Sequence, residues 1–330
     1  MFFMQNCRLI DDDLALCGTD AQITYQVKLV TTLDLELNTV LSVDSDQHLK
    51  AAFTKYFDKI FVDYVHDVDL SFYSKETQER VYHETHIIDA SEKSFILYLK
   101  SDRYTHLSAC NIDEAVNVRL EGDEDPLTMR LMQHEGDTLN PHTTGLFTAR
   151  LDMNVQTDTS QNFIVPLYMA NSGIGLVVDT LGSSVKDIEV YVQDMATDFW
   201  IMDSVYHFLS NPLISMEQVP VIGRMGMQAE ADTLHPSFLE RRLCYATTCF
   251  PSRDTLVTSD YVWRMKVYVH TVEDKIAENT LTIKTPLRAS SLRILKIKLG
   301  RNGEARVMNE DVGASVNLDW HGGNVFNPDL

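Results

Sequence analysis

Five cysteines are the side chains of this chain with the most distinctive chemistry, and the first has the most informative neighbours. Cys7 follows a short apolar run at residues 1–4 and precedes an acidic run at residues 11–13. A cysteine between two such segments is typical of the site where an exported bacterial protein is cleaved and lipidated. A complete export signal needs a basic start and an apolar stretch of about 7 to 15 residues, so we expect residues 1–6 to be the tail of a longer signal. The alternative is an ordinary thiol in a frayed terminus.

The other four cysteines leave two interpretations open. If Cys7 carries lipid, an even number remains, and proximity in the sequence favours the bridges Cys17–Cys110 and Cys244–Cys249. Buried free thiols are the alternative, because four cysteines allow three pairings and the sequence does not choose among them. Zinc is disfavoured, since the spacing from Cys244 to Cys249 lacks the second pair of cysteines or histidines that a zinc site needs.

Other groupings of reactive side chains do not predict a catalytic or metal site. His83 and His86 are three residues apart, so on a strand their rings point to opposite faces. The acidic residues at 44–46 and 123–125 lack the twelve-residue calcium loop with its glycine and final glutamate. The glycines at 173 and 175 have no third glycine or following helix, and no nucleophile elbow occurs. We therefore expect no enzyme, no metal and no cofactor.

Composition excludes further classes. The chain has 330 residues, enough for two domains of ordinary size. Its formal net charge of -20 disfavours nucleic acid as a partner, because phosphate binding needs clustered lysines and arginines. No run of 18 or more apolar residues follows Cys7, so any membrane attachment is expected at the N-terminus.

Alternation of apolar and polar residues predicts strands, each with one buried and one solvent-facing side. The clearest cases are residues 23–29, 68–72, 95–99, 188–192, 263–269 and 312–320. Strands that follow one another without regular helices favour antiparallel sandwiches over a parallel sheet. We predict a mainly β fold of two tandem antiparallel β-sandwich domains. A polar, loop-like stretch at about 120–145 and a new strand at 162–167 suggest domains 1–156 and 157–330.

Two local patterns add detail. Apolar residues recur at helical spacing between Leu49 and Ile60, which predicts a short accessory helix lying on the first sandwich. Core packing is the ordinary reason for such a stripe, and binding of a partner is the alternative. Asn302-Gly303 is the strongest turn signal, because this dipeptide suits the positive φ angles of a tight hairpin.

Several segments resemble, in order along the chain, one family of surface proteins. They are residues 7–17 with the strand at 23–29, residues 65–73, 95–99 and 104–109, residues 163–167 leading through 174–178 to 185–191, and residues 316–330. Together they are similar to the fimbrial anchor lipoproteins of Bacteroidetes, the FimB-like minor fimbrial subunits. Cys244 and Cys249 are not part of this pattern.

The resemblance implies a specific architecture and role. The fold would be two tandem transthyretin-like β-sandwiches, with a diacylglyceryl group on the Cys7 sulfur and a fatty acyl chain such as palmitate on its new amino group. The diacylglyceryl group and the N-acyl chain together would give stable membrane attachment, because a single acyl chain binds membranes only marginally. The protein would sit at the outer membrane surface, bind fimbrial structural subunits and support cell adhesion. Assembly would proceed by strand addition at an open sheet edge, for which residues 292–320 are the candidates.

Two other functions stay open from the sequence. A carbohydrate-binding surface lipoprotein would use Trp200, Trp263 or Trp320 as sugar platforms, although alternation places Trp263 and Trp320 among core neighbours. A tryptophan exposed in a cleft would favour this alternative. A hydrolase would need a histidine and a carboxylate brought by the fold to a serine or cysteine.

Overall fold

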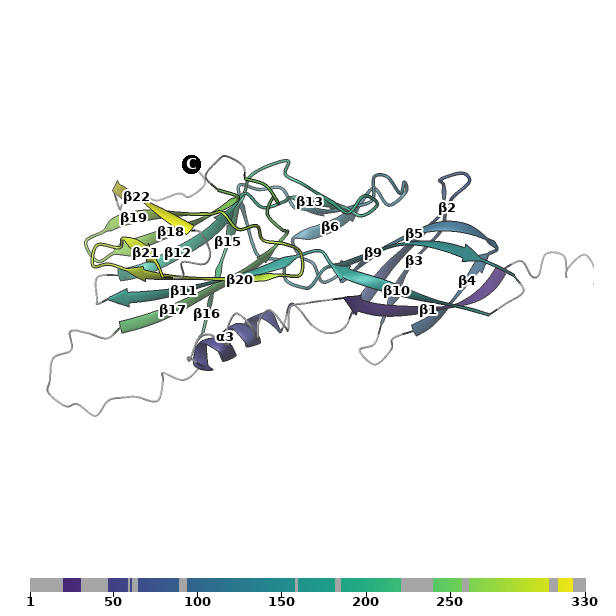
Figure 1. The fold of residues 1–330 in the computed structure, drawn as a ribbon, viewed down its shortest axis with the longest axis horizontal. Helices are drawn as coiled ribbons and strands as arrows, with labels where there is room; N and C mark the ends of the chain where they lie inside the picture. The colour runs from purple at the N-terminus through teal and green to yellow at the C-terminus, as the bar shows by residue number, and fades with distance from the viewer. Residues whose placement is uncertain are drawn as a thin grey trace, which may run out of the picture.

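The computed structural model describes residues 20–30, 47–58, 60, 65–88, 94–157, 160–181, 185–220, 240–256, 261–308 and 314–322. Figure 1 shows an elongated molecule in which two β-sheet units follow one another along the long axis. The described residues contain one helix, α3 (Gln47–Phe57), which is too short to cross a membrane. The predicted mainly β fold with a short accessory helix is confirmed.

The first unit is a seven-stranded sheet folded into a sandwich. Its strands, in spatial order, are β3 (Arg80–Ile87), β2 (Asp67–Ser74), β5 (Asp102–Cys110), β9 (Phe147–Val155), β10 (Gln161–Met169), β1 (Asp20–Val30) and β4 (Ser94–Lys100). Only two residue pairs join β9 to β10, Tyr168 with Thr148 and Met169 with Phe147. The sheet therefore bends there, and the layer β3-β2-β5-β9 packs on the layer β10-β1-β4.

A buried polar contact links the two layers of this sandwich. The Tyr25 hydroxyl on β1 lies 2.7 Å from His106 Nε2 on β5, and both side chains are buried. The second ring nitrogen, Nδ1, lies 3.1 Å from the Ser71 carbonyl oxygen. Because that carbonyl accepts a hydrogen bond, Nδ1 carries the proton, and Nε2 accepts the bond from Tyr25. A neutral histidine is thus built into the core.

Strand β2 departs from the predicted alternation. All eight of its residues are buried, including Asp67 and Asp69, which the sequence placed in solvent. A second apolar cluster, which includes Tyr73, Leu107 and Met129, covers the outer face of the strand. The prediction of a solvent-facing side is wrong for β2. Alternation in the sequence identifies the apolar face of a strand, but it does not show whether another part of the chain covers the opposite face.

The second unit is a sandwich of two sheets. One contains β16 (Glu217–Val219), β17 (Glu240–Cys249), β11 (Ser172–Leu181), β20 (Leu292–Leu299) and β21 (Ala305–Val307). The other contains β22 (Ala314–Gly322), β19 (Lys275–Ile283), β18 (Trp263–Thr271), β12 (Val185–Gln193), β15 (Leu213–Ser215) and β8 (Thr138–Leu139). Apolar side chains of both sheets form the core between them, with Trp263 fully buried.

The predicted hairpin at Asn302-Gly303 joins β20 to β21. Gly303 has a φ of 79°, and the buried Asn279 fixes the turn. Its Nδ2 donates to the Gly303 carbonyl oxygen at 2.9 Å, and its Oδ1 accepts from the Ala305 N–H at 2.8 Å. The predicted hairpin is confirmed, but only its glycine has a positive φ, and the loop spans residues 300–304 instead of two residues.

Strands from both halves of the chain share sheets. A small sheet combines β14 (Val205–His207) and β13 (Asp198–Trp200) with β7 (Arg130–Gln133) and β6 (Val118–Glu121). The stretch at about 120–145, which the sequence predicted as loop, thus contains β7 and β8. In addition, β10 follows residue 156 but pairs with β1 of the first unit. The division of the chain into domains 1–156 and 157–330 stays a proposal. These pairings show that each of the two ranges supplies strands to sheets of the other.

The buried imidazoles predict how stability depends on pH. Burial lowers the pKa of His106 to about 4 and that of His142 to about 3. Unfolding restores an ordinary pKa near 6.5, so below that pH the unfolded state takes up protons that the folded state does not, and stability falls as pH falls. Burial raises the pKa of Asp67 and Asp69, which acts in the opposite direction.

We expect the wild type to lose about 2 kcal/mol more stability than His106→Gln between pH 7 and pH 5. The contributions of His142 and of the two aspartates are common to both proteins and cancel. Chemical denaturation of the two proteins at both pH values measures the difference. An equal pH dependence would contradict a neutral His106 in the core.

Candidate functional site

The helix α3 packs on the second unit, although its residues lie between β1 and β2 of the first. Figure 1 shows it against the outer side of the sheet that contains β16, β17 and β11. Its buried side chains Leu49, Phe53 and Phe57 belong to the same cluster as Cys244 and Ile294 of that sheet. The prediction that the helix lies on the first sandwich is wrong, because helical spacing identifies the apolar side but not the surface that it meets.

Two glycines of β11 make room for the aromatic rings of α3. A Cβ atom at Gly173 would lie 2.8 Å from Phe57 Cε1, and one at Gly175 would lie 2.9 Å from Phe53 Cε1. Both distances are shorter than real Cβ contacts. Glycine within a strand usually weakens it and marks a place of close approach. Here the absence of side chains at Gly173 and Gly175 leaves the space that the two rings occupy, and we call this surface of β11 the seat of α3.

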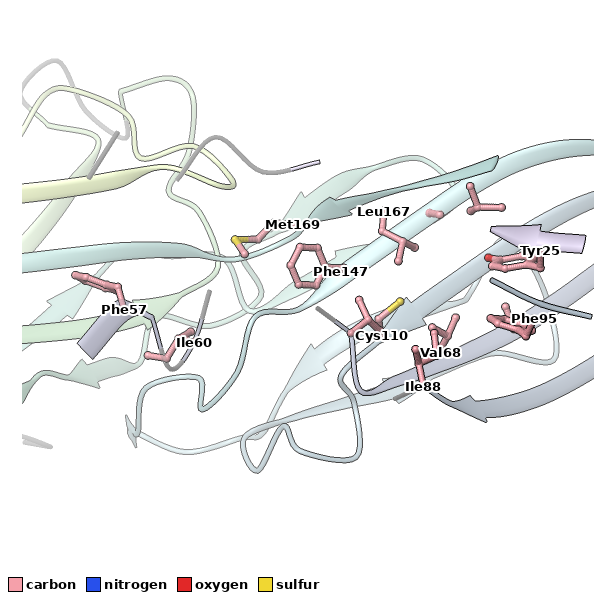
Figure 2. Close-up of a cluster of buried hydrophobic side chains, with 14 of the residues drawn as sticks. Tyr25, Phe57, Ile60, Val68, Ile88, Phe95, Cys110, Phe147, Leu167 and Met169 are labelled. Carbon is pink, nitrogen blue, oxygen red and sulfur yellow. The ribbon is translucent and has the colours of Figure 1, made fainter. Parts of the chain in front are cut away.

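A continuous apolar cluster runs from this seat into the first sandwich. Figure 2 shows Phe57 and Ile60 at one end, Phe147 and Met169 in the middle, and Tyr25 among the side chains at the other end. At the seat, burial and then the carboxylate of Glu217 on β16 raise the pKa of Tyr56. The helix therefore joins the core of the first unit to the outer face of the sheet that contains β11 and β17.

The cysteines follow the free-thiol interpretation where the structure describes them. Cys110, Cys244 and Cys249 are free and buried, and burial raises the pKa of Cys249 to about 12. The predicted bridge Cys244–Cys249 is wrong, because five residues of β17 separate the two Cα atoms by about 16 Å, and a disulfide needs less than about 7 Å. Their side chains also lie in different cores. Cys7 and Cys17 lie outside the described residues.

The histidines and acids flagged in the sequence form a structural network. His83 Nε2 lies 2.9 Å from Asp69 Oδ2, while Arg80 is paired with Asp123 and Glu124. These contacts fasten β2 and β3 to the turn after β6. His86 instead stacks on Phe95. No group of metal-ligating side chains occurs in the part of the chain that the structure describes, and residues 44–46 lie outside it.

The tryptophans offer no open platform where their side chains are described. Trp263 is buried and donates from Nε1 to the Thr285 carbonyl oxygen at 3.0 Å. Trp200 stacks on His207 with ring centroids 5.2 Å apart, and the Arg130 guanidinium lies 5.4 Å from its ring. These two neighbours come from the strands on either side of β13. The side chain of Trp320 lies outside the description.

The second sandwich ends in a long edge strand. β22 pairs with β19 along its whole length, from Ala314 opposite Ile283 to Gly322 opposite Lys275. It is the last strand of its sheet among the described residues, and Asn317 in its middle is exposed. The three-residue strand β21 ends the facing sheet beside it. A strand edge exposes backbone groups that can pair with another chain.

Sequence reasoning missed the seat of α3. In the sequence, Gly173 and Gly175 are an incomplete dinucleotide-binding pattern, because a third glycine and a following helix are missing. The sequence does contain a signal for it: two glycines at alternate positions of an otherwise apolar strand. Such a pair lies on one face of the strand and lets another element pack closely against that face. A search for an aromatic stripe of matching spacing would have identified Phe53 and Phe57.

Comparisons with known proteins agree with this architecture. A family model described as fimbrillin-A associated anchor proteins Mfa1 and Mfa2 matches residues 33–206, more than half of the chain. A candidate adhesin from Bacteroides thetaiotaomicron is 12% identical, with 88% of this chain and 97% of that chain covered and a TM-score of 0.52. Among curated proteins, none matches this chain significantly in sequence.

Two further solved structures are similar over most of their length. A candidate polysaccharide-binding protein from Bacteroides thetaiotaomicron is 9% identical, with 88% of this chain and 99% of that chain covered and a TM-score of 0.50. The fimbrial anchor protein Mfa2 from Porphyromonas gingivalis is 9% identical, with 92% and 100% covered and a TM-score of 0.48. At such identities the similarity concerns the fold alone.

The seat of α3 predicts the effect of a single added methyl group. Gly175→Ala should lower the free energy of unfolding by about 1 to 3 kcal/mol, because the new Cβ displaces Phe53 in a packed core. It should also speed the reaction of Cys244, which lies on the same face of the sheet, with a maleimide. Denaturation and mass-spectrometric mapping of the labelled cysteines measure the two effects, with Cys249 as the internal reference.

The control is Ser94→Thr, which also adds one methyl group but at an exposed residue of β4, and it should leave both readouts unchanged. Phe53→Leu added to Gly175→Ala should restore part of the stability, because the smaller side chain yields the space. Unchanged Cys244 labelling in Gly175→Ala, or no recovery in the double variant, would show that the ring of Phe53 does not depend on this glycine.

Proposed function

Because this chain belongs to the family of fimbrillin-A associated anchor proteins, we propose that it is an outer-membrane surface lipoprotein that serves as the anchor or accessory subunit of an adhesive fimbrium. Its partners would be fimbrial structural subunits and, through a lipid on Cys7, the outer membrane. The observation that carries the proposal is the family match across residues 33–206, which spans most of the first sandwich, α3 and the start of the second unit.

The architecture suits a mechanical role. Membership of a fimbrial anchor family places the protein at the cell surface in association with other subunits. An anchor must transmit force from a fibre to a membrane, and here a continuous apolar cluster holds the two units together through α3. Two histidines make structural contacts, His106 with Tyr25 and His83 with Asp69, which favours a structural protein over an enzyme.

Subunits would join by strand addition at an open edge of the second sandwich. Backbone hydrogen bonds would supply affinity, and the alternating side-chain positions would supply specificity. The edge strand β22 and the hairpin between β20 and β21 are the candidate elements, as the sequence suggested. With nine residues, β22 is longer than the other strands that end sheets of the second unit, and a long open edge is otherwise an aggregation hazard.

The lipid anchor is tested at Cys7. The gene is expressed with its native upstream region, and the wild type is compared with Cys7→Ala by cell fractionation and N-terminal mass spectrometry. We expect the wild type in the outer membrane with a diacylglyceryl thioether and an N-acyl group, and the variant in the soluble fraction. Cys17→Ala is the matched control and should stay in the membrane. An unmodified Cys7 in the wild type would contradict lipid anchoring.

The assembly edge is tested by crosslinking in cells. A photo-crosslinking amino acid is placed at Asn317, which is exposed on β22, and a control is placed at Val272, which is exposed in the turn between β18 and β19. We expect light-dependent adducts with another fimbrial subunit from Asn317 and not from Val272. Adducts in equal yield from both positions, or from neither, would rule out β22 as the assembly edge.

A further inference from the structure

The outer face of the layer β4-β1-β10 is an exposed surface that carries several large apolar side chains. Alternate residues of each strand point away from the sandwich core. The outward residues are Asp20, Gln22, Thr24, Gln26, Lys28 and Val30 on β1, Ser94, Ile96, Tyr98 and Lys100 on β4, and Asn162, Ile164, Pro166 and Tyr168 on β10. We call this surface the tyrosine face.

Large apolar side chains form a diagonal stripe across the tyrosine face. Tyr98, Ile96, Ile164 and Tyr168 are 59%, 52%, 54% and 55% exposed. In the pairing register, Tyr98 stands opposite Gln22 and Tyr168 stands opposite Val30 of the central strand. These positions are eight residues apart, so the stripe is about 26 Å long. An exposed apolar patch of this kind marks an interaction site.

The tyrosine face has two lysines and one aspartate, so its own net charge is about +1 in a chain whose net charge is -20. Its charged residues are Lys28, Lys100 and, at the end of β1 opposite Lys100, Asp20. The remaining polar groups are carboxamides and hydroxyls, which both donate and accept hydrogen bonds. Polyanions are repelled by the acidic protein, and this face offers them no compensating cluster of cations. A ligand that binds through these apolar, carboxamide and hydroxyl groups needs no charge of its own.

The size of the tyrosine face argues against a protein as the ligand. Three strands about 4.8 Å apart and a stripe of about 26 Å give a footprint of roughly 350 Å². A stable protein interface needs about 800 Å² on each partner. A ligand that follows the stripe is instead long, narrow and able to lie flat on a sheet.

We propose that the tyrosine face binds an uncharged linear polysaccharide. The rings of Tyr98 and Tyr168 would pack on the CH-rich faces of sugar rings at the two ends of the stripe, and the isoleucines would pack on the chain between them. Gln22, Gln26 and Asn162 would exchange hydrogen bonds with sugar hydroxyls. This site is independent of the lipid anchor and of the edge strand β22, which lies in the other sandwich.

The test uses the full chain and an array of neutral oligosaccharides, with polyuronates of matched length beside them. We expect a neutral oligosaccharide to bind, with an affinity that salt does not change, because no ion pair forms. Tyr98→Ala and Tyr168→Ala should each weaken binding about tenfold, which corresponds to the loss of about 1.4 kcal/mol of packing. Val272→Ala, a substitution at an exposed apolar residue of the second unit, should bind as the wild type does.

Three outcomes would overturn the proposal. They are the absence of binding to any neutral oligosaccharide, binding that both tyrosine variants retain, and salt-sensitive binding to polyuronates alone. Sedimentation of the same variants provides a further arm, since a change of oligomeric state in Tyr98→Ala and Tyr168→Ala would make the face a protein interface. Thermal unfolding of each variant confirms that these outward-pointing substitutions leave the fold intact.

Discussion

The packing of two phenylalanine rings against two glycines is the contact on which the arrangement of the whole molecule depends. Phe53 and Phe57 reach the surface of β11 because Gly173 and Gly175 have no side chains. Helix α3 is only eleven residues long, and a helix of that length is marginal in isolation. Its stability must therefore come from this seat, and the seat in turn fixes a segment of the first half of the chain onto the second unit.

The same contact explains why the two units share one apolar cluster. Tandem domains usually meet through modest, polar interfaces and move relative to one another. Here the cluster that begins in the sandwich of β1 and β5 continues to the outer face of β11 and β17. Strand pairing between the two halves of the chain adds to this, since β7 pairs with β13, and β8 pairs with β15. A protein built in this way resists bending between its units, which suits the proposed role of transmitting force.

Local patterns predicted the elements of this fold, and long-range packing decided where they lie. Alternation identified β1, β4, β12 and β18, and Asn-Gly identified the hairpin, because each signal depends on backbone geometry within a few residues. The family resemblance is confirmed by the match over residues 33–206. The same patterns gave the wrong surface for α3 and a solvent-facing side for β2, since periodicity does not specify the partner of an apolar face. The Cys244–Cys249 bridge failed for a related reason: closeness in sequence becomes separation along an extended strand.

The distribution of charge separates the surfaces that such a protein presents. With a net charge of -20, most of its exterior repels copies of itself and other acidic proteins, which keeps a surface protein from associating at random. Contacts must then form where that field is weak or where backbone groups, which carry no net charge, do the binding. The edge of β22 meets the second condition, and the tyrosine face meets the first. The two surfaces lie in different sandwiches, so a partner at one leaves the other accessible. If both proposals hold, the second unit joins a fibre through β22 while the tyrosine face of the first unit contacts the surroundings.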